Sequence, residues 1–318
     1  MIRLAYLDDK ELQRRLVGEY LQKLDVMKVQ KKWDEAKKTY PCLSGLTYTV
    51  KQLVCSNFGL LVKYAKEYKK VIKGVTDNKE RNEINLHLRD KVFAYKGRRH
   101  DDIIAPFFME HAEEIGIYTC HYCDTAYVNV YECEVKKARK AIKQSHFDLD
   151  HVIGRTECPI VSLSLFNFVP SCQVCNSRLK HDNPLNYSLT LLKKLSPTCK
   201  DHDFEKKVTI ELMPLKELKQ PYLEHKDCYK VEFDCHKDKD YEKMVGIFRL
   251  NERYNYHRGE ALRIKDLQRQ YPPANIWNIS NLLNVPYQQV EEDIFGLKFM
   301  KDEHRCFDKL RRDILGIG

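Results

Sequence analysis

The chain has 318 residues, of which 43% are hydrophobic and 32% charged, and its formal net charge is +9 at pH 7. The length predicts two or three structural units, and the hydrophobic fraction is sufficient for a packed core. The charge favours an anionic partner such as nucleic acid, although a mild excess of lysine is also found on ordinary soluble proteins.

The cysteine content and the apolar runs exclude two classes of protein. Twelve cysteines in a chain of this length do not indicate a disulfide scaffold. No apolar run approaches the roughly 20 residues of a membrane-spanning helix, and the N-terminus has no apolar signal core. We therefore expect a soluble, cytoplasmic protein without a membrane partner. Eight cysteines lack metal-ligand spacing and are expected to be free thiols: Cys42, Cys55, Cys133, Cys158, Cys199, Cys228, Cys235 and Cys306.

Residues 1–115 are expected to form a helical N-terminal region. Apolar residues recur at helical spacing from Leu12 to Met27, after an aspartate that can cap the helix. Similar stripes run from Leu53 to Val71 and from Ile84 to Val92, and each ends near a glycine. These stripes most simply face a core, and a partner-binding helix face is the alternative.

Two C-x-x-C pairs mark residues 116–190 as the part of the chain that carries chemistry. Thiolates two residues apart can both point into one tetrahedral site from a tight turn, and two such turns complete the site. The four candidate ligands of a structural Zn²⁺ are therefore Cys120, Cys123, Cys172 and Cys175. A zinc knuckle without any catalysis would show the same two pairs.

Between the two pairs, residues 133–145 carry a cluster of basic side chains and are expected to form a helix. The cluster could contact a nucleic-acid backbone, or it could be an ordinary solvated helix face. Its members are Lys136, Lys137, Arg139, Lys140 and Lys143.

Asp150 and His151 are adjacent on an expected hairpin strand, where neighbouring side chains point to opposite faces. Asp150 can therefore turn toward a metal ion while His151 faces a water molecule. A neutral imidazole accepts a proton from water near pH 7. Carboxylate and amide oxygens, as on Asp150 and Asn176, suit Mg²⁺ or Mn²⁺. Taken alone, the dipeptide also fits a strand end with a hydrogen-bonded histidine.

A helix expected from about Gln173 places Asn176 and Lys180 four residues apart, on one face. Lys180 is therefore a candidate contact to a phosphate next to the metal. Arg178 lies around the helix from it, and Arg155 is the third candidate contact to the nucleic-acid backbone.

Residues 191–318 are expected to form a mixed C-terminal region that is mostly helical. In two stretches, apolar and polar residues alternate with a period of two, which predicts strands. Three other stretches have helical patterns, and a Pro-Pro pair follows the first of the three helical stretches. The expected strands are 208–212 and 229–233, and the expected helical segments are 240–271, 287–295 and 303–315.

The motif residues resemble the HNH (ββα-metal) endonucleases, in the form that carries a four-cysteine zinc site. The three letters of the motif fall on His151, Asn167 and Asn176, and the resemblance covers mainly residues 116–180. A looser likeness to the HNH endonucleases of retron and anti-phage defence systems extends to residues 248–257.

The resemblance implies a role for each motif residue. His151 would be the general base, and Asn167 would hold the loop and orient His151. Asp150 and Asn176 would bind the catalytic Mg²⁺ or Mn²⁺. Two features depart from the family pattern: Gly154 stands where proline is frequent, and Asn176 replaces a histidine, which favours an oxygen-preferring cation.

We therefore expect an α+β protein with a helical N-terminal region, a zinc-stapled ββα-metal (HNH) module and a mixed C-terminal region. The expected function is metal-dependent endonuclease cleavage of nucleic acid, with DNA as the first substrate. RNA, including tRNA, is the alternative substrate, and a catalytically dead nucleic-acid-binding or partner-binding adaptor is the alternative class. The resemblance also implies a role in anti-phage defence, with an ATPase or a reverse transcriptase of the same operon as partner.

Overall fold

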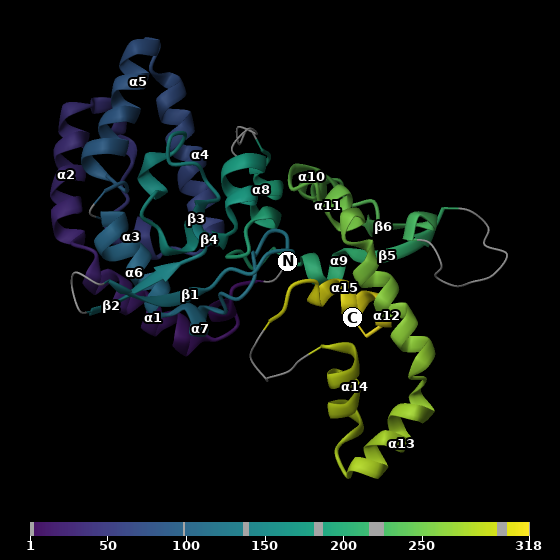
Figure 1. Ribbon diagram of the computed structural model, residues 1–318. Coiled ribbons are helices and arrows are strands. Elements are labelled where there is room, and N and C mark those ends of the chain that lie inside the picture. The colour runs from purple at the N-terminus through teal and green to yellow at the C-terminus, as the bar shows by residue number, and fades with distance from the viewer. Residues whose placement is uncertain are drawn as a thin grey trace.

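Figure 1 shows the computed structural model, which describes residues 3–97, 99–135, 140–180, 187–215, 226–297 and 304–317. Helices surround three separate two-stranded antiparallel sheets in this part of the chain. This arrangement confirms the expected α+β class. Among the described residues, no helix combines the length and the apolar character that crossing a membrane requires.

The N-terminal region is helical, as predicted, but its helices are shorter than the apolar stripes suggest. The first stripe is divided because α1 ends at Lys23 and Asp25 caps a new helix, accepting a hydrogen bond from the backbone N–H of Lys28 at 3.1 Å. The helices are α1 (Lys10–Lys23), α2 (Val26–Thr39), α3 (Val50–Cys55), α4 (Phe58–Gly74), α5 (Asn78–His87), α6 (Ala105–Glu110) and α7 (Ala112–Ile115). Short 3₁₀ and π turns join them: η1 (Ala5–Leu7), η2 (Pro41–Gly45), η3 (Leu88–Val92) and η4 (His100–Ile104).

The segment of the two C-x-x-C pairs folds against these helices and shares their core. The Tyr20 hydroxyl donates to the carbonyl of Leu163 at 3.0 Å, and the hydroxyls of Ser162 and Ser164 donate to carbonyls of the helical region. One cluster of buried apolar residues extends from Leu4 to Ile314. The boundaries proposed at residues 115 and 190 therefore do not separate independent cores.

Asp150 and His151 lie on a two-stranded antiparallel sheet, in which β3 (Asp148–His151) pairs with β4 (Phe168–Ser171). Asp150 lies opposite Val169, and His151 lies opposite Phe168. The short helical turns η5 (Pro159–Val161) and η6 (Leu165–Asn167) lie between β3 and β4, and the π-helix η7 (Val174–Lys180) follows β4. The helix expected from Gln173 is thus present as η7.

The helix expected over residues 133–145 is wrong, because β1 (Val130–Val135) and β2 (Lys140–Ser145) form an antiparallel hairpin there. Opposite charges face each other in its register, with Glu132 opposite Lys143, and such cross-strand pairs favour a sheet. Lys143 is exposed. Lys136, Lys137 and Arg139 lie outside the described residues.

The C-terminal region has the two predicted strands, β5 (Thr209–Pro214) and β6 (Tyr229–Asp234), which pair with each other. Proline at position 273 begins a helix that the sequence did not predict, because proline is well tolerated in the first turn. The remaining elements are α8 (Leu189–Leu195), α9 (Phe204–Lys207), η8 (Lys226–Cys228), α10 (Lys239–Ile247), α11 (Leu250–Tyr256), α12 (Arg258–Gln270), α13 (Pro273–Leu283), α14 (Tyr287–Phe295) and α15 (Asp308–Leu315). Helices α13 and α14 lie apart from the rest and have a small apolar cluster of their own.

Candidate metal centre and active site

The four cysteines of the two C-x-x-C pairs come together in the fold. Their Sγ atoms all lie within 4.8 Å of one another, and all four residues are buried. Zinc–sulfur bonds of about 2.3 Å in a tetrahedron place sulfur atoms about 3.8 Å apart, close to the 4.0 Å between Cys123 and Cys172. The four thiols can therefore bind one metal ion, as predicted, and their number and spacing fit Zn²⁺.

Backbone geometry positions these sulfurs. Asp124 adopts a left-handed conformation with φ of 55° just after the first pair, and its N–H donates to the Cys120 carbonyl at 2.9 Å. The N–H of Cys172 donates to Cys120 Sγ at 3.2 Å. An N–H aimed at sulfur stabilises the thiolate form that binds metal.

Arg253, on α11, reaches the cluster from the C-terminal region. Its Nη1 donates to Cys175 Sγ and its Nη2 to Cys123 Sγ, each at 3.2 Å. Burial opposes the charged guanidinium, but the two sulfurs raise the pKa of Arg253 overall. The sequence pattern of residues 248–257 does not by itself indicate this role for Arg253, because the contact joins residues far apart in the chain.

Neighbouring contacts join the C-terminal region to the first turn of the cluster. The Tyr254 hydroxyl donates to the Cys123 carbonyl at 2.9 Å, and the N–H of Phe307 donates to the Asp124 carbonyl at 2.8 Å. His304 Nε2 lies 2.8 Å from the buried carboxylate of Asp124. The metal centre is therefore enclosed by residues far from it in sequence.

His151 is held in one orientation by a backbone carbonyl. Its Nε2 lies 2.9 Å from the Ser162 carbonyl oxygen, which can only accept, so Nε2 carries the proton and Nδ1 is the basic nitrogen. The rings of Tyr95 and Phe168 pack edge-on against the imidazole, with centroids at 4.5 and 4.8 Å. Burial lowers the pKa of His151 to about 4, so the ring is neutral at pH 7.

Asn167 is fully buried and holds the loop that follows His151. Its Oδ1 accepts from the N–H of Ile153 at 2.8 Å, and its Nδ2 donates to the carbonyls of Ile153 and Val161 at 3.0 and 3.2 Å. This geometry corresponds to the loop-holding part of the predicted role.

Asp150 lies on the other face of β3 and has two close donors. Its Oδ2 accepts from the Tyr122 hydroxyl at 2.6 Å and from Lys180 Nζ at 2.5 Å. Lys180 Nζ also donates to the His151 carbonyl at 2.6 Å, and its side chain is 5% exposed. Lys180 thus points inward to the carboxylate and the backbone, whereas the helix pattern predicts a contact to phosphate.

Asn176 contacts the carboxylate of Asp148, the residue that begins β3. Its Nδ2 donates to Asp148 Oδ2 at 3.1 Å, and the Ser177 hydroxyl lies 3.5 Å from the same oxygen. Asp148 was not singled out, although its spacing of two residues from Asp150 on a strand places both on one face. The pairing of Asp150 and Asn176 as metal ligands stays a prediction.

The two predicted arginines lie at the edge of this region. Arg178 is exposed on η7, and Arg155 is partly exposed on the loop after His151. The charge of Arg155 is near enough to contribute to lowering the pKa of His151.

Comparison of the chain with protein-family models, with curated proteins and with solved structures finds no match.

Replacing Asn167 with alanine should lower the free energy of unfolding by about 2–4 kcal/mol, because a buried N–H and two carbonyls lose their partner. Urea unfolding measures the change. Asn278, an exposed residue of α13, provides the matched control, and its alanine variant should stay within about 0.5 kcal/mol of wild type. Equal stability of the two variants would contradict this role of Asn167.

Replacing Arg253 with methionine should weaken zinc binding about 10- to 100-fold, since the two sulfurs lose a charged hydrogen-bond donor. Competition with a colorimetric chelator measures zinc affinity. The control is Arg263→Met on α12, where the arginine is exposed. If both variants retain zinc as wild type does, Arg253 does not support the metal centre.

Proposed function

We propose that this chain is an HNH-type endonuclease that hydrolyses phosphodiester bonds of nucleic acid, with DNA as the first substrate. The supporting observation is the arrangement around His151. A neutral imidazole presents Nδ1 as its basic nitrogen, and carboxylates extend from the opposite face of the same strand. A four-thiol metal centre lies at the end of the paired strand.

His151 would act as the general base of the reaction. Its Nε2–H is fixed on the Ser162 carbonyl, so Nδ1 can accept the proton of a water molecule that attacks the phosphorus. Asn167 donates to the carbonyl of Val161, the residue before Ser162, and so holds the acceptor of the Nε2–H in place. The rings of Tyr95 and Phe168 restrict rotation of the imidazole. These residues keep the base in one orientation before any substrate binds.

The catalytic Mg²⁺ or Mn²⁺ of this proposal would be held by Asp150 and Asn176, with Asp148 beside them. Their oxygens suit a hard divalent cation, which would stabilise negative charge on the phosphate. Lys180, however, already neutralises Asp150 at 2.5 Å. Within the described residues, no group of three or more histidine, cysteine or acidic ligands other than the four cysteines comes together. Divalent-ion binding at Asp150 therefore requires the Lys180 ammonium to move.

The looser likeness of residues 248–257 supports a further part of the proposal, a cytoplasmic role in anti-phage defence with an ATPase or reverse-transcriptase partner. Co-purification of the chain from its native operon would test it.

Replacing His151 with alanine should reduce cleavage by about 10²–10⁴ while the zinc content is unchanged, because the base is lost and the thiols are not. Nicking of plasmid DNA and cleavage of a matched RNA measure the activity. His146→Ala, an exposed histidine of the preceding hairpin, is the control and should retain activity. A His151→Ala protein as active as the control would disprove the assignment, and cleavage of RNA alone would change the substrate.

Without added Mn²⁺, replacing Lys180 with methionine should destabilise the protein by about 3–5 kcal/mol, since the buried Asp150 carboxylate loses its cation. Added Mn²⁺ should then raise the melting temperature of this variant more than that of wild type, because the competing ammonium is absent. Differential scanning calorimetry with and without Mn²⁺ measures both effects. An identical response to Mn²⁺ in the two proteins would show that no divalent ion binds at Asp150.

A further inference from the structure

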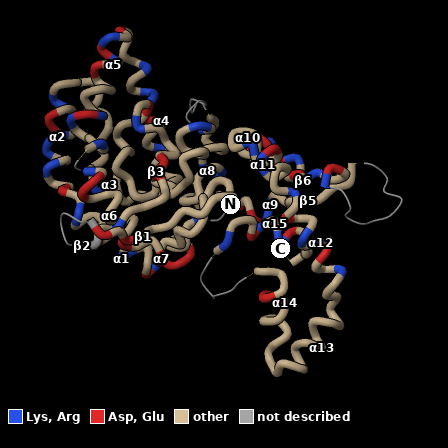
Figure 2. Tube along the Cα trace, viewed as in Figure 1, with Lys and Arg blue, Asp and Glu red and all other residues tan. Residues whose placement is uncertain are grey.

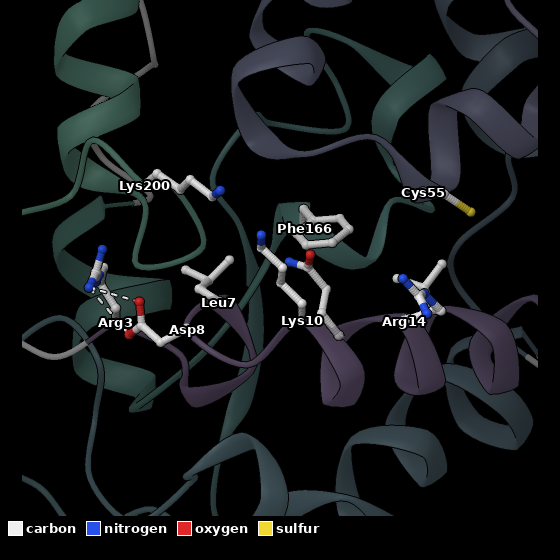
Figure 3. Close-up of a pocket in the computed structure, with 10 residues that line it drawn as sticks. Arg3, Leu7, Asp8, Lys10, Arg14, Cys55, Phe166 and Lys200 are labelled. Atoms are coloured by element: carbon white, nitrogen blue, oxygen red, sulfur yellow. Dashed lines mark hydrogen bonds and ion pairs between the residues drawn. The ribbon is translucent and has the colours of Figure 1, made fainter.

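A basic region, separate from the motif, lies between the N-terminal helices and the segment after α8. A cavity of about 610 Å³ opens there between the start of α1 and the segment after α8. Four cations and one acid line it, namely Arg3, Lys10, Arg14, Lys200 and Asp8. Figure 3 shows Lys10 and Lys200 extending into the same space from these two parts of the chain.

The charges of this cavity are poorly balanced by the protein. Asp8 pairs with Arg3 at 3.0 Å, and Asp201, next to Lys200, pairs instead with Lys193 at 3.2 Å. In the described part of the chain, Lys10, Arg14 and Lys200 have no ion pair. Acidic and basic residues are interspersed along the outer helices (Figure 2), so three unpaired cations around one cavity are a local excess. Like charges brought together without an acid favour binding of an anion.

The shape of the charged surface indicates what kind of anion fits. Lys10 and Arg14 are four residues apart on α1, so they share a face and are separated by roughly 6 Å along the helix. Lys200 extends the positive surface beyond α1, and Figure 3 shows Arg14 and Lys200 at separate positions along it. A row of exposed cations suits successive phosphates of a polymer better than one compact anion.

One residue that lines the cavity is adjacent in sequence to a residue of the candidate active site. Phe166 lines the cavity, and the next residue, Asn167, bonds the loop that follows His151. Phe166 is itself buried, so the cavity lies against η6, the short segment that holds this loop, and the segment stays covered by the protein.

We propose that this cavity, lined by Lys10, Arg14 and Lys200, is a second binding site for the phosphate backbone of nucleic acid. The proposal rests on the proposed nuclease function and extends it, because it assigns an anchoring surface away from the cleavage residues. Backbone contacts position a nucleic acid without reading its sequence.

The test is binding of a fluorescent 30-base-pair DNA duplex to the full chain carrying His151→Ala, so that substrate is not cleaved. In that background, Lys10, Arg14 and Lys200 are changed together to glutamine. Affinity should fall about tenfold or more, and the slope of log affinity against log salt should decrease by about 2.7, or 0.9 for each lost phosphate contact. All three side chains are at the surface, so folding and zinc content should be unchanged.

The matched control removes the same charge elsewhere. Lys63, Lys66 and Lys70 are exposed on α4 and are changed together to glutamine. If both triple variants weaken binding equally, or if the cavity variant binds as its parent does, the proposal is wrong. Cleavage by the chain with His151 intact is measured separately: its absence would overturn the nuclease function, whereas the contrast between the two triple variants decides the cavity.

Discussion

Convergence of four buried thiols is the constraint on which the candidate site depends. The two turns that supply them are 52 residues apart in the chain, measured from Cys120 to Cys172. A cross-link over a loop of this length restricts the unfolded chain by an amount worth about 4 kcal/mol. Four thiolates around a divalent cation also leave negative charge in a buried place, and the guanidinium of Arg253 lies where it offsets part of that charge.

The four-cysteine cluster in turn determines where the candidate catalytic residues lie. Cys172 follows directly after β4, whose last residue, Ser171, pairs with Asp148 at the start of β3. Cys175 lies in η7, the element that carries Asn176 and Lys180 toward β3. A displacement of the thiols would therefore shift both the strand register and the helix at once. The same centre gives residues 248–257 a structural role, so their pattern is explained in part without any partner.

Local spacing in the sequence predicted the features that depend on local geometry. The spacing of the C-x-x-C pairs predicted that the four thiols converge, and strand periodicity predicted the strand with Asp150 and the two strands of the C-terminal region. The structure contains all of these features. The contacts of Arg253, Tyr122 and Ser162 could not be predicted, because they join positions that are far apart or separated by an irregular loop. The error at residues 133–145 has another cause: a run of lysines fits an exposed helix as well as an exposed hairpin, and only the cross-strand register distinguishes them.

The buried pair of Lys180 and Asp150 is the least expected feature of the site, and stability alone does not account for it. Both side chains are at most 7% exposed, and removing two charges from water costs several kcal/mol per ion before their attraction is counted. An apolar pair of similar volume would often stabilise a core as well. The position of the Lys180–Asp150 pair has a different consequence, because Lys180 donates to the His151 carbonyl as well as to the Asp150 carboxylate. One ammonium group therefore bonds both the backbone of His151 and the Asp150 carboxylate on the opposite face of β3. A divalent cation that displaces the ammonium from Asp150 would also break its hydrogen bond to the His151 carbonyl.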